Sequence, residues 1–450
     1  MCQDRVIPWR RKSHWGLARL AQNSGQSQVW VPPWKSCVSD SSRPVSGALP
    51  AAMAMTPTER RASASLASIF ALRMLGLFLV LPVFALEARK YPGGDDPALL
   101  GLAMGIYGLT KGALQLPFGM ASDRFGRKRI IVLGLLIFAA GSFWAAAATD
   151  LRGLLIGRSL QGAGAVSAAV TALLADLTRD EVRTKAMALV GASIGLMFAV
   201  SLVLAPVLAA AVGLTGLFSI TGALALLGVL VVVWGAPPAP PMQVGAPRGR
   251  LLDVLRHAGL MRMNFGVFVL HAVQLAMWVA VPALLVQAGL PKESHWQVYL
   301  PAVLGSFVLM GGMFALERRG HLKKVFLAAI LLIALVQVGL LVVSFGSPGL
   351  AALGGLLFAF FCGFNILEAT QPSLVSRLAP MQVRGTAMGV YNTLQSLGFF
   401  VGGWAGGALV KGWGSQMLFL CCAAAMLLWW LVALPMQAPG RQAAAAQKPA

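Results

Sequence analysis

The chain has 450 residues, of which 58% are hydrophobic and only 11% are charged. Soluble domains usually carry roughly 45–50% apolar residues, so a soluble fold would leave much of this apolar surface uncovered. The formal net charge of +21 would suit a nucleic-acid-binding protein, but the basic residues gather in short segments between long apolar runs. Composition therefore excludes a nucleic-acid partner and predicts an integral protein of a lipid bilayer.

Residues 1–60 differ from the rest of the chain, because they are polar, rich in Ser, Pro and Arg, and lack the apolar core of a signal peptide. We expect a disordered extension, or one that results from an upstream start codon, with Met53 or Met55 as the true start. A regulatory tail is the alternative interpretation.

Twelve apolar runs follow, and each approaches or exceeds the roughly 20 residues that a membrane-spanning helix needs. Run length favours helices over strands, and only helices satisfy their own backbone hydrogen bonds in lipid without closing a barrel. The predicted fold is an all-α membrane protein with twelve transmembrane helices. The runs cover residues 66–88, 98–119, 129–148, 152–175, 186–211, 213–234, 262–288, 295–316, 324–345, 349–373, 386–410 and 414–435.

The loops between these runs differ in charge, and this difference predicts the orientation. Alternate loops carry seventeen Lys and Arg residues, whereas the other loops carry five. Positive loops face the cytoplasm, so both termini are expected to be cytoplasmic. The five are Arg89, Lys90, Arg152, Lys292 and Lys411; the seventeen are Arg124, Arg127, Lys128, Arg129, Arg179, Arg183, Lys185, Arg248, Arg250, Arg256, Arg262, Arg318, Arg319, Lys323, Lys324, Arg377 and Arg384.

A proline-rich loop over residues 236–261 divides the runs into six and six, and its end, "RGRLLDVLRHAGL", could form a short amphipathic helix at the membrane surface. Val182-Arg183 and Ala186-Met187 recur as Val383-Arg384 and Ala387-Met388, at a constant offset of 201 and in the same loop of each half. We therefore predict two pseudo-symmetric six-helix bundles, over residues 61–235 and 262–435, followed by a cytoplasmic tail over residues 436–450.

The most specific segment is "GMASDRFGRKR", from Gly119 to Arg129. Two glycines allow a tight turn and a close helix approach, and an acid among cations at a membrane boundary should be paired. The segment resembles the signature loop between helices 2 and 3 of the major facilitator superfamily. The resemblance implies a gate that holds the inner ends of the two bundles together, with Asp176 in the same charge network. The matching residues are Gly119, Asp123, Arg124, Gly126, Arg127 and Lys128.

Two further segments resemble motifs of that family. In "GRSLQGAGA", Arg158 and Gln161 match the motif of helix 4, and an arginine inside a span is a functional candidate unless it reaches the surface. Gly162 and Gly164 of that segment are expected to serve packing. The helix 5 motif of antiporters is matched at Gly191, Gly195 and Pro206, although Ala205 stands where glycine is expected.

The stretch from residue 66 to 435 is similar to the bacterial drug:proton antiporter-like branch of the superfamily, the YajR-like transporters. The segments "LRMLGLFLVLPVF", "GIYGLTKGALQLPFGMASDRFGRK" and "GTAMGVYNTLQSLG" carry this similarity. It implies proton-coupled exchange in a bacterial inner membrane. Some members have a soluble domain after helix 12, which we do not expect here, since about fifteen residues follow the last run.

Polar residues within the runs are the candidate proton and substrate sites. Glu368 is the clearest carboxylate well inside a span, and its alternative is a fixed salt bridge with Lys111 or Arg73. His271 is a second titratable candidate. Asn365 adds a polar group to the Glu368 helix.

We therefore expect a proton-coupled secondary transporter, an exporter of a small organic molecule by alternating access, acting as a monomer. An uptake symporter or anion transporter of the same fold, and a non-transporting sensor or scaffold, are the alternatives. Because Arg73, Lys111 and Arg158 lie at membrane depth in the N-terminal half without a comparable carboxylate, we expect a neutral or anionic substrate. No nucleotide-binding or hydrolase motif supports an enzyme, and no cofactor or metal is expected.

Overall fold

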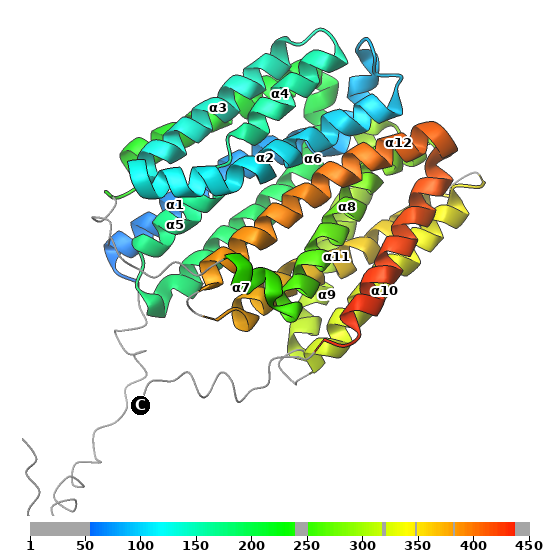
Figure 1. Cartoon of the computed structure of the whole chain (residues 1–450). Coiled ribbons are helices and arrows are strands. Elements are labelled where there is room, and N and C mark those ends of the chain that lie inside the picture. Colours follow the sequence, from blue (N-terminus) through cyan, green and yellow to red (C-terminus); the bar gives the residue numbers. More distant parts are fainter. Residues whose placement is uncertain (1–54, 239–250, 317–320, 347–348, 381–382, 437–450) are drawn as a thin grey trace, which may run out of the picture. The chain divides into compact units, whose positions relative to one another are not determined.

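The computed structural model describes residues 55–238, 251–316, 321–346, 349–380 and 383–436, and within these ranges it contains helices and turns but no strand (Figure 1). The helices are α1 (Pro57–Glu87), α2 (Pro97–Phe125), α3 (Arg127–Ala147), α4 (Leu151–Ala163), α5 (Ser167–Asp176), α6 (Asp180–Leu230), α7 (Leu251–Arg256), α8 (Ala258–Gln287), α9 (Trp296–Leu316), α10 (Leu322–Val343), α11 (Leu350–Leu378) and α12 (Arg384–Ala433).

Eight helices in the described ranges are long and apolar enough to cross a membrane: α1, α2, α3, α6, α8, α10, α11 and α12. Helices α6 and α12 each contain one glycine with non-helical backbone angles, Gly213 (φ 63°) and Gly414 (φ 81°). A predicted run begins at each of these glycines, and in Figure 1 the red part of α12 turns back along its orange part. Since α4 with α5 covers another run and α9 a further one, these ranges are consistent with the twelve expected passes.

Helix boundaries follow local capping signals more closely than hydropathy. Helix α1 begins at Pro57, nine residues before the predicted run, because Thr56 and Glu59 form a capping box at its start. Asp96 caps α2 in a similar way by accepting a hydrogen bond from the Ala98 N–H. Helix α7 occupies the segment expected to form a short surface helix.

Several sequence-based expectations fall on segments outside the described residues. They are the N-terminal extension over residues 1–54, most of the proline-rich loop (239–250), and the tail over residues 437–450. The domain limits at residues 60, 235, 261 and 435 lie within described ranges and stay predictions, although α1 already includes residues 57–60.

Helices α2 and α12 bring the two predicted halves together through glycine backbones. A Cβ atom placed on Gly101 would lie 2.2 Å from the Gly403 carbonyl oxygen, and one on Gly407 would lie 2.3 Å from the Pro97 carbonyl oxygen. Another set of glycines on α12, Gly398 and Gly402, faces the backbone of α8 in the same way. Small residues at such spacing permit the close backbone packing that stabilises helix pairs in membranes.

Two ion pairs join the halves where α1 ends and α2 begins, a region that we call the Glu87 end. Lys292 contacts Glu87, which is 2% exposed, and the Nζ atom of Lys411 lies 2.7 Å from Asp96 Oδ2. The opposite end, which contains the loop between α2 and α3, is called the Asp123 end. The Glu87 end is therefore held closed by both glycine packing and charge.

The contact between Gly403 and Gly101 predicts that the destabilisation caused by a Gly→Ala substitution in α12 depends strongly on its position. Replacing Gly403 with alanine places a methyl group 2.5 Å from the Gly101 carbonyl oxygen. We expect this variant to lose about 1–3 kcal/mol of stability, because overpacking forces the backbones apart. Gly389→Ala is the matched control, since nothing lies within 4 Å of its added methyl group. Thermal unfolding of the detergent-purified protein checks this, and equal effects of the two substitutions would contradict it.

The ion pairs predict that the Glu87 end depends on two lysines. We expect Lys292→Gln combined with Lys411→Gln to lengthen spin-label distances between the ends of α1 and α8, with Lys324→Gln at the Asp123 end as control. The Lys411 ammonium holds the pKa of Asp96 below its ordinary value of about 4. The stabilisation that the Asp96–Lys411 ion pair gives the folded protein is therefore present above about pH 4. It is lost only as the pH falls through the lowered pKa of Asp96. Unchanged distances in the double variant would refute the role of the pairs.

Candidate functional site

The motif loop at the Asp123 end forms a charge network inside the N-terminal half. Gly126 ends α2 with φ 98°, a left-handed conformation that favours glycine. Arg127 contacts Asp123 one turn earlier, and its Nε atom donates to Asp176 Oδ2 at 3.0 Å. Lys128 donates to the Ala236 carbonyl oxygen at 2.5 Å. The expected contact between Asp176 and a loop arginine is therefore present, whereas the gating role of the network stays a prediction.

Among the other motif residues, Gly119 lacks the close helix approach that the sequence suggested. A methyl group on Gly119 would meet only Ala168, at an ordinary 3.7 Å, so no close helix approach requires glycine there. Arg124 lies over the ring of Phe125, 5.4 Å from its centroid. On α6, Gly191 has open space around it and Gly195 has only Phe307 at 3.9 Å, while Pro206 lies inside the helix.

Arg73 is buried in the N-terminal half and is held by three hydrogen bonds. Its guanidinium donates to Ser167 Oγ at 3.0 Å, to Tyr107 Oη at 3.1 Å and to the Gly164 carbonyl oxygen at 3.2 Å. The side chain is 1% exposed and also lies over the ring of Phe138. Such contacts compensate part of the cost of placing an arginine at membrane depth.

Arg158 is also held inside the bundle, so the alternative in which it reaches the surface is wrong. It is 4% exposed, donates to Gln161 Oε1 at 3.0 Å, and lies over the rings of Tyr107 and Phe84. Gln161 in turn donates a hydrogen bond from Nε2 to Ser142 Oγ at 2.8 Å. The two motif residues therefore form one buried polar chain between α4 and α3.

Gly162 and Gly164 serve packing, as expected. A methyl group on Gly162 would lie 2.0 Å from Thr110 Oγ1, and one on Gly164 would lie 2.4 Å from the Gly134 carbonyl oxygen. These close contacts hold the α4–α5 junction against α2 and α3.

Lys111 is the third cation at this depth, and it differs from the two arginines. Its side chain is 8% exposed, one helical turn beyond Tyr107 on α2. Among the residues that the structure describes, no hydrogen bond or ion pair reaches its ammonium group. Its neighbours on α2, Gly108 and Gly112, have their nearest contacts in α12 of the other half.

Glu368 of α11 forms a cluster with His271 of α8 and Gln395 of α12. Its Oε2 atom lies 3.3 Å from His271 Nε2, and its Oε1 atom accepts from Gln395 Nε2 at 3.3 Å. The same Gln395 nitrogen lies 2.9 Å from His271 Nε2. The expected alternative, a fixed salt bridge from Glu368 to Lys111 or Arg73, is therefore wrong, because the direct partner of the carboxylate is the histidine.

The contact between Glu368 Oε2 and His271 Nε2 has no hydrogen between the two atoms when the glutamate is a carboxylate and the imidazole is neutral. His271 Nδ1 lies 2.9 Å from the Val267 carbonyl oxygen, which can only accept, so Nδ1 carries a hydrogen. In a neutral imidazole the Nε2 atom then presents a lone pair toward the lone pairs of Glu368 Oε2. Oε2 is shielded from solvent and has no hydrogen-bond partner in the described part of the chain. A proton on Glu368 Oε2 would let it donate toward His271 Nε2, whereas a proton on Nε2 would face the Gln395 amide nitrogen, which is also a donor.

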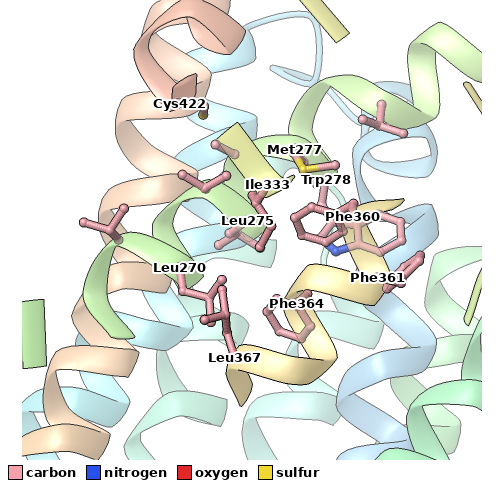
Figure 2. Close-up of a cluster of buried hydrophobic side chains, with 14 of the residues drawn as sticks. Leu270, Leu275, Met277, Trp278, Ile333, Phe360, Phe361, Phe364, Leu367 and Cys422 are labelled. Carbon is pink, nitrogen blue, oxygen red and sulfur yellow. The ribbon is translucent and has the colours of Figure 1, made fainter. Parts of the chain in front are cut away.

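Asn365 and a group of aromatic rings complete the surroundings of this cluster. Asn365 Nδ2 donates to Ser306 Oγ at 2.8 Å, which ties α11 to α9. Phe364 lies edge-on to His271, with ring centroids 5.9 Å apart, and stacks on Phe360. Figure 2 shows Phe360, Phe361, Phe364 and Trp278 gathered between α8 and α11. All of these except Phe364 border a small apolar pocket.

Two residues of the arrangement were not candidates in the sequence. Gln395 carries the second contact to Glu368, and Tyr107 lies between Arg73 and Arg158. A glutamine or tyrosine in an apolar helix carries no signal of its own, and only its helical spacing to a known site residue could have indicated it. No cluster of three or more His, Cys, Asp or Glu suited to a metal occurs in the described ranges.

Comparison with known proteins identifies the family of this arrangement. The model of the Major Facilitator Superfamily matches residues 66–403. The chain is 41% identical to the inner membrane transport protein YajR of Escherichia coli (strain K12), over 86% of this chain and 85% of that protein. It is 27% identical to the multidrug resistance protein MdtH of Aeromonas hydrophila, over 75% and 84% of the two chains.

Solved structures agree on the fold. The crystal structure of the human organic anion transporter MFSD10 matches with a TM-score of 0.63 at 20% identity, over 84% of this chain and all of that one. At this identity the likeness concerns the fold alone. Together with the family match and the YajR similarity, it shows that this chain belongs to the major facilitator superfamily, in its YajR-like branch.

Proposed function

We propose that this chain is a proton-coupled secondary active transporter of a small organic molecule, and that Glu368 and His271 together bind the coupling proton. The observation that carries the proposal is the 3.3 Å contact between Glu368 Oε2 and His271 Nε2, which lacks a proton in the ordinary ionisation states. Carboxylate and imidazole this close titrate as one pair. The glutamate side chain is 39% exposed, so water can deliver a proton to it.

Alternating access would let this proton exchange with each side of the membrane in turn. The Glu87 end is closed by ion pairs and glycine packing. Features of the Asp123 end support an opening there: Leu116 and Met120 of α2 are more than half exposed, and Gly385 and Gly389 of α12 face open space. The excess of basic residues in the loops at this end supports a cytoplasmic location for it and for both termini.

Two directions of coupling have support. Export by proton antiport is favoured by the name of the relative MdtH, a multidrug resistance protein, and a bacterial inner-membrane location by that of YajR. Proton symport of an anion is the second candidate. It is favoured by Lys111, because its charge interacts with that of Glu368, so protonation of Glu368 would leave net positive charge between the halves.

A pH jump on reconstituted protein tests proton binding without knowledge of the substrate. We expect the wild-type protein, adsorbed in proteoliposomes on a solid-supported membrane, to give a transient charge displacement when the external pH changes. Glu368→Gln should abolish this signal, because the amide cannot take up the proton. His271→Gln should shift its pH dependence, because it removes the partner that shares the proton.

The control is Asp253→Asn, which removes an exposed carboxylate from α7, and it should leave the displacement unchanged. A full displacement in Glu368→Gln would refute the proposed proton site. Absence of any displacement in the wild-type protein would favour the alternative of a non-transporting scaffold on the same fold.

A further inference from the structure

Lys111 is a largely buried cation to whose ammonium group the described residues offer no hydrogen bond or ion pair, which sets it apart from its neighbours. Arg73 makes three hydrogen bonds and Arg158 makes two, to side chains and carbonyl oxygens of their own half. Lys111 is 92% buried and has none among the described residues. A buried charge without a partner is costly, so its retention suggests a ligand that supplies the missing acceptor.

Gln115, one helical turn beyond Lys111, is a second buried polar side chain without a hydrogen-bond partner among the described residues. It is 2% exposed, and neither its amide nitrogen nor its amide oxygen has a hydrogen-bond partner in the described chain. Residues four apart lie on one helix face, so Gln115 and Lys111 are neighbours on α2. At about 100° per residue, this face lies between Tyr107, which contacts Arg73, and Gly112, whose nearest neighbours are in α12.

The hydrogen-bond donors on this face of α2 favour an anionic ligand. An ammonium and an amide N–H are both donors, and a carboxylate accepts strong, charge-assisted hydrogen bonds from such groups. The nearby charges of Arg73 and Lys111 and the buried Arg158 make the N-terminal half repel a cation. On the opposite half, Phe360, Phe361 and Trp278 border a small apolar pocket (Figure 2).

We propose that Lys111 and Gln115 bind the carboxylate of an organic anion, and that this anion is the transported substrate. The inference rests on the proposed transport function and names the substrate class for the same central site. Its carboxylate would become the counterion of Lys111.

Proton binding and anion binding would then favour one another. The titratable and charged groups that face the site are Arg73 of α1, Tyr107 and Lys111 of α2, Arg158 of α4, His271 of α8, Glu368 of α11 and Tyr391 of α12. Under the proposed function, Glu368 and His271 together take up the coupling proton. Proton uptake would remove the negative charge of this pair, so the anion should bind more tightly as the pH is lowered.

A matched set of probes tests the substrate class on the full-length protein in detergent. The set consists of aromatic carboxylates, beginning with benzoate and naphthoate, each paired with its carboxamide and its amidine. We expect carboxylates to raise the melting temperature of the wild-type protein, since binding to the folded state stabilises it. Carboxamides should act weakly, and amidines should not bind.

Variants locate the binding. Lys111→Gln should weaken carboxylate binding roughly tenfold to a hundredfold, because it removes a charge-assisted hydrogen bond. Lys111→Arg should restore part of it, and the exposed control Lys324→Gln should leave it unchanged. Glu368→Gln should retain binding but lose its pH dependence. A merely structural role of Lys111 would change the melting temperature of the unliganded protein without this selectivity.

Three results would overturn the inference: no carboxylate binds, amidines bind instead, or carboxylates bind equally well to Lys111→Gln. If proton displacement is nevertheless observed and depends on Glu368, the transport function stands and only the substrate class fails. If carboxylates bind through Lys111 but Glu368→Gln leaves proton displacement intact, the proposed proton site fails and the anion site stands.

Discussion

The structure depends on how this chain compensates charge at membrane depth. Ionised groups there are costly unless other groups satisfy them, and the protein uses two different solutions. Arg73 and Arg158 are enclosed by hydroxyl, carbonyl and aromatic partners in their own half. Glu368 shares a contact with His271 that is complete only when a proton is present. The first solution gives a permanent structure, whereas the second would, if the proposed proton binding holds, make the local charge depend on pH.

Helix packing places the two buried arginines and the Glu368–His271 contact on opposite sides of the interface between the halves. The glycines of α12 allow close contact with α8 on one face and with α2 on another. Gln395 lies on the same helix, so the element that joins the halves also carries a contact to Glu368. A change in the protonation of Glu368 would therefore act on the helix that packs against both halves. This connection offers a physical route from proton binding to rearrangement of the interface.

Sequence reasoning predicted the helices well but the site only in part. Apolar run length identified the spans, and the breaks at Gly213 and Gly414 coincide with the starts of predicted runs. Glu368 and His271 were found separately, because a charged or titratable group stands out in an apolar helix. Their contact was not predicted, since 97 positions separate them and only the packing of α8 against α11 brings them together. Arg158 was open to two interpretations until its partner Gln161 was placed beside it.

The central claim is that Glu368 and His271 share one titrating proton. Infrared difference spectra of the reconstituted protein, recorded between acidic and alkaline pH, test it most directly, because a protonated carboxyl group has its own stretching band. The account predicts one such band that appears as the pH falls, disappears in Glu368→Gln, and moves in pH midpoint in His271→Gln. A spectrum in which this band is unaffected by Glu368→Gln would contradict it.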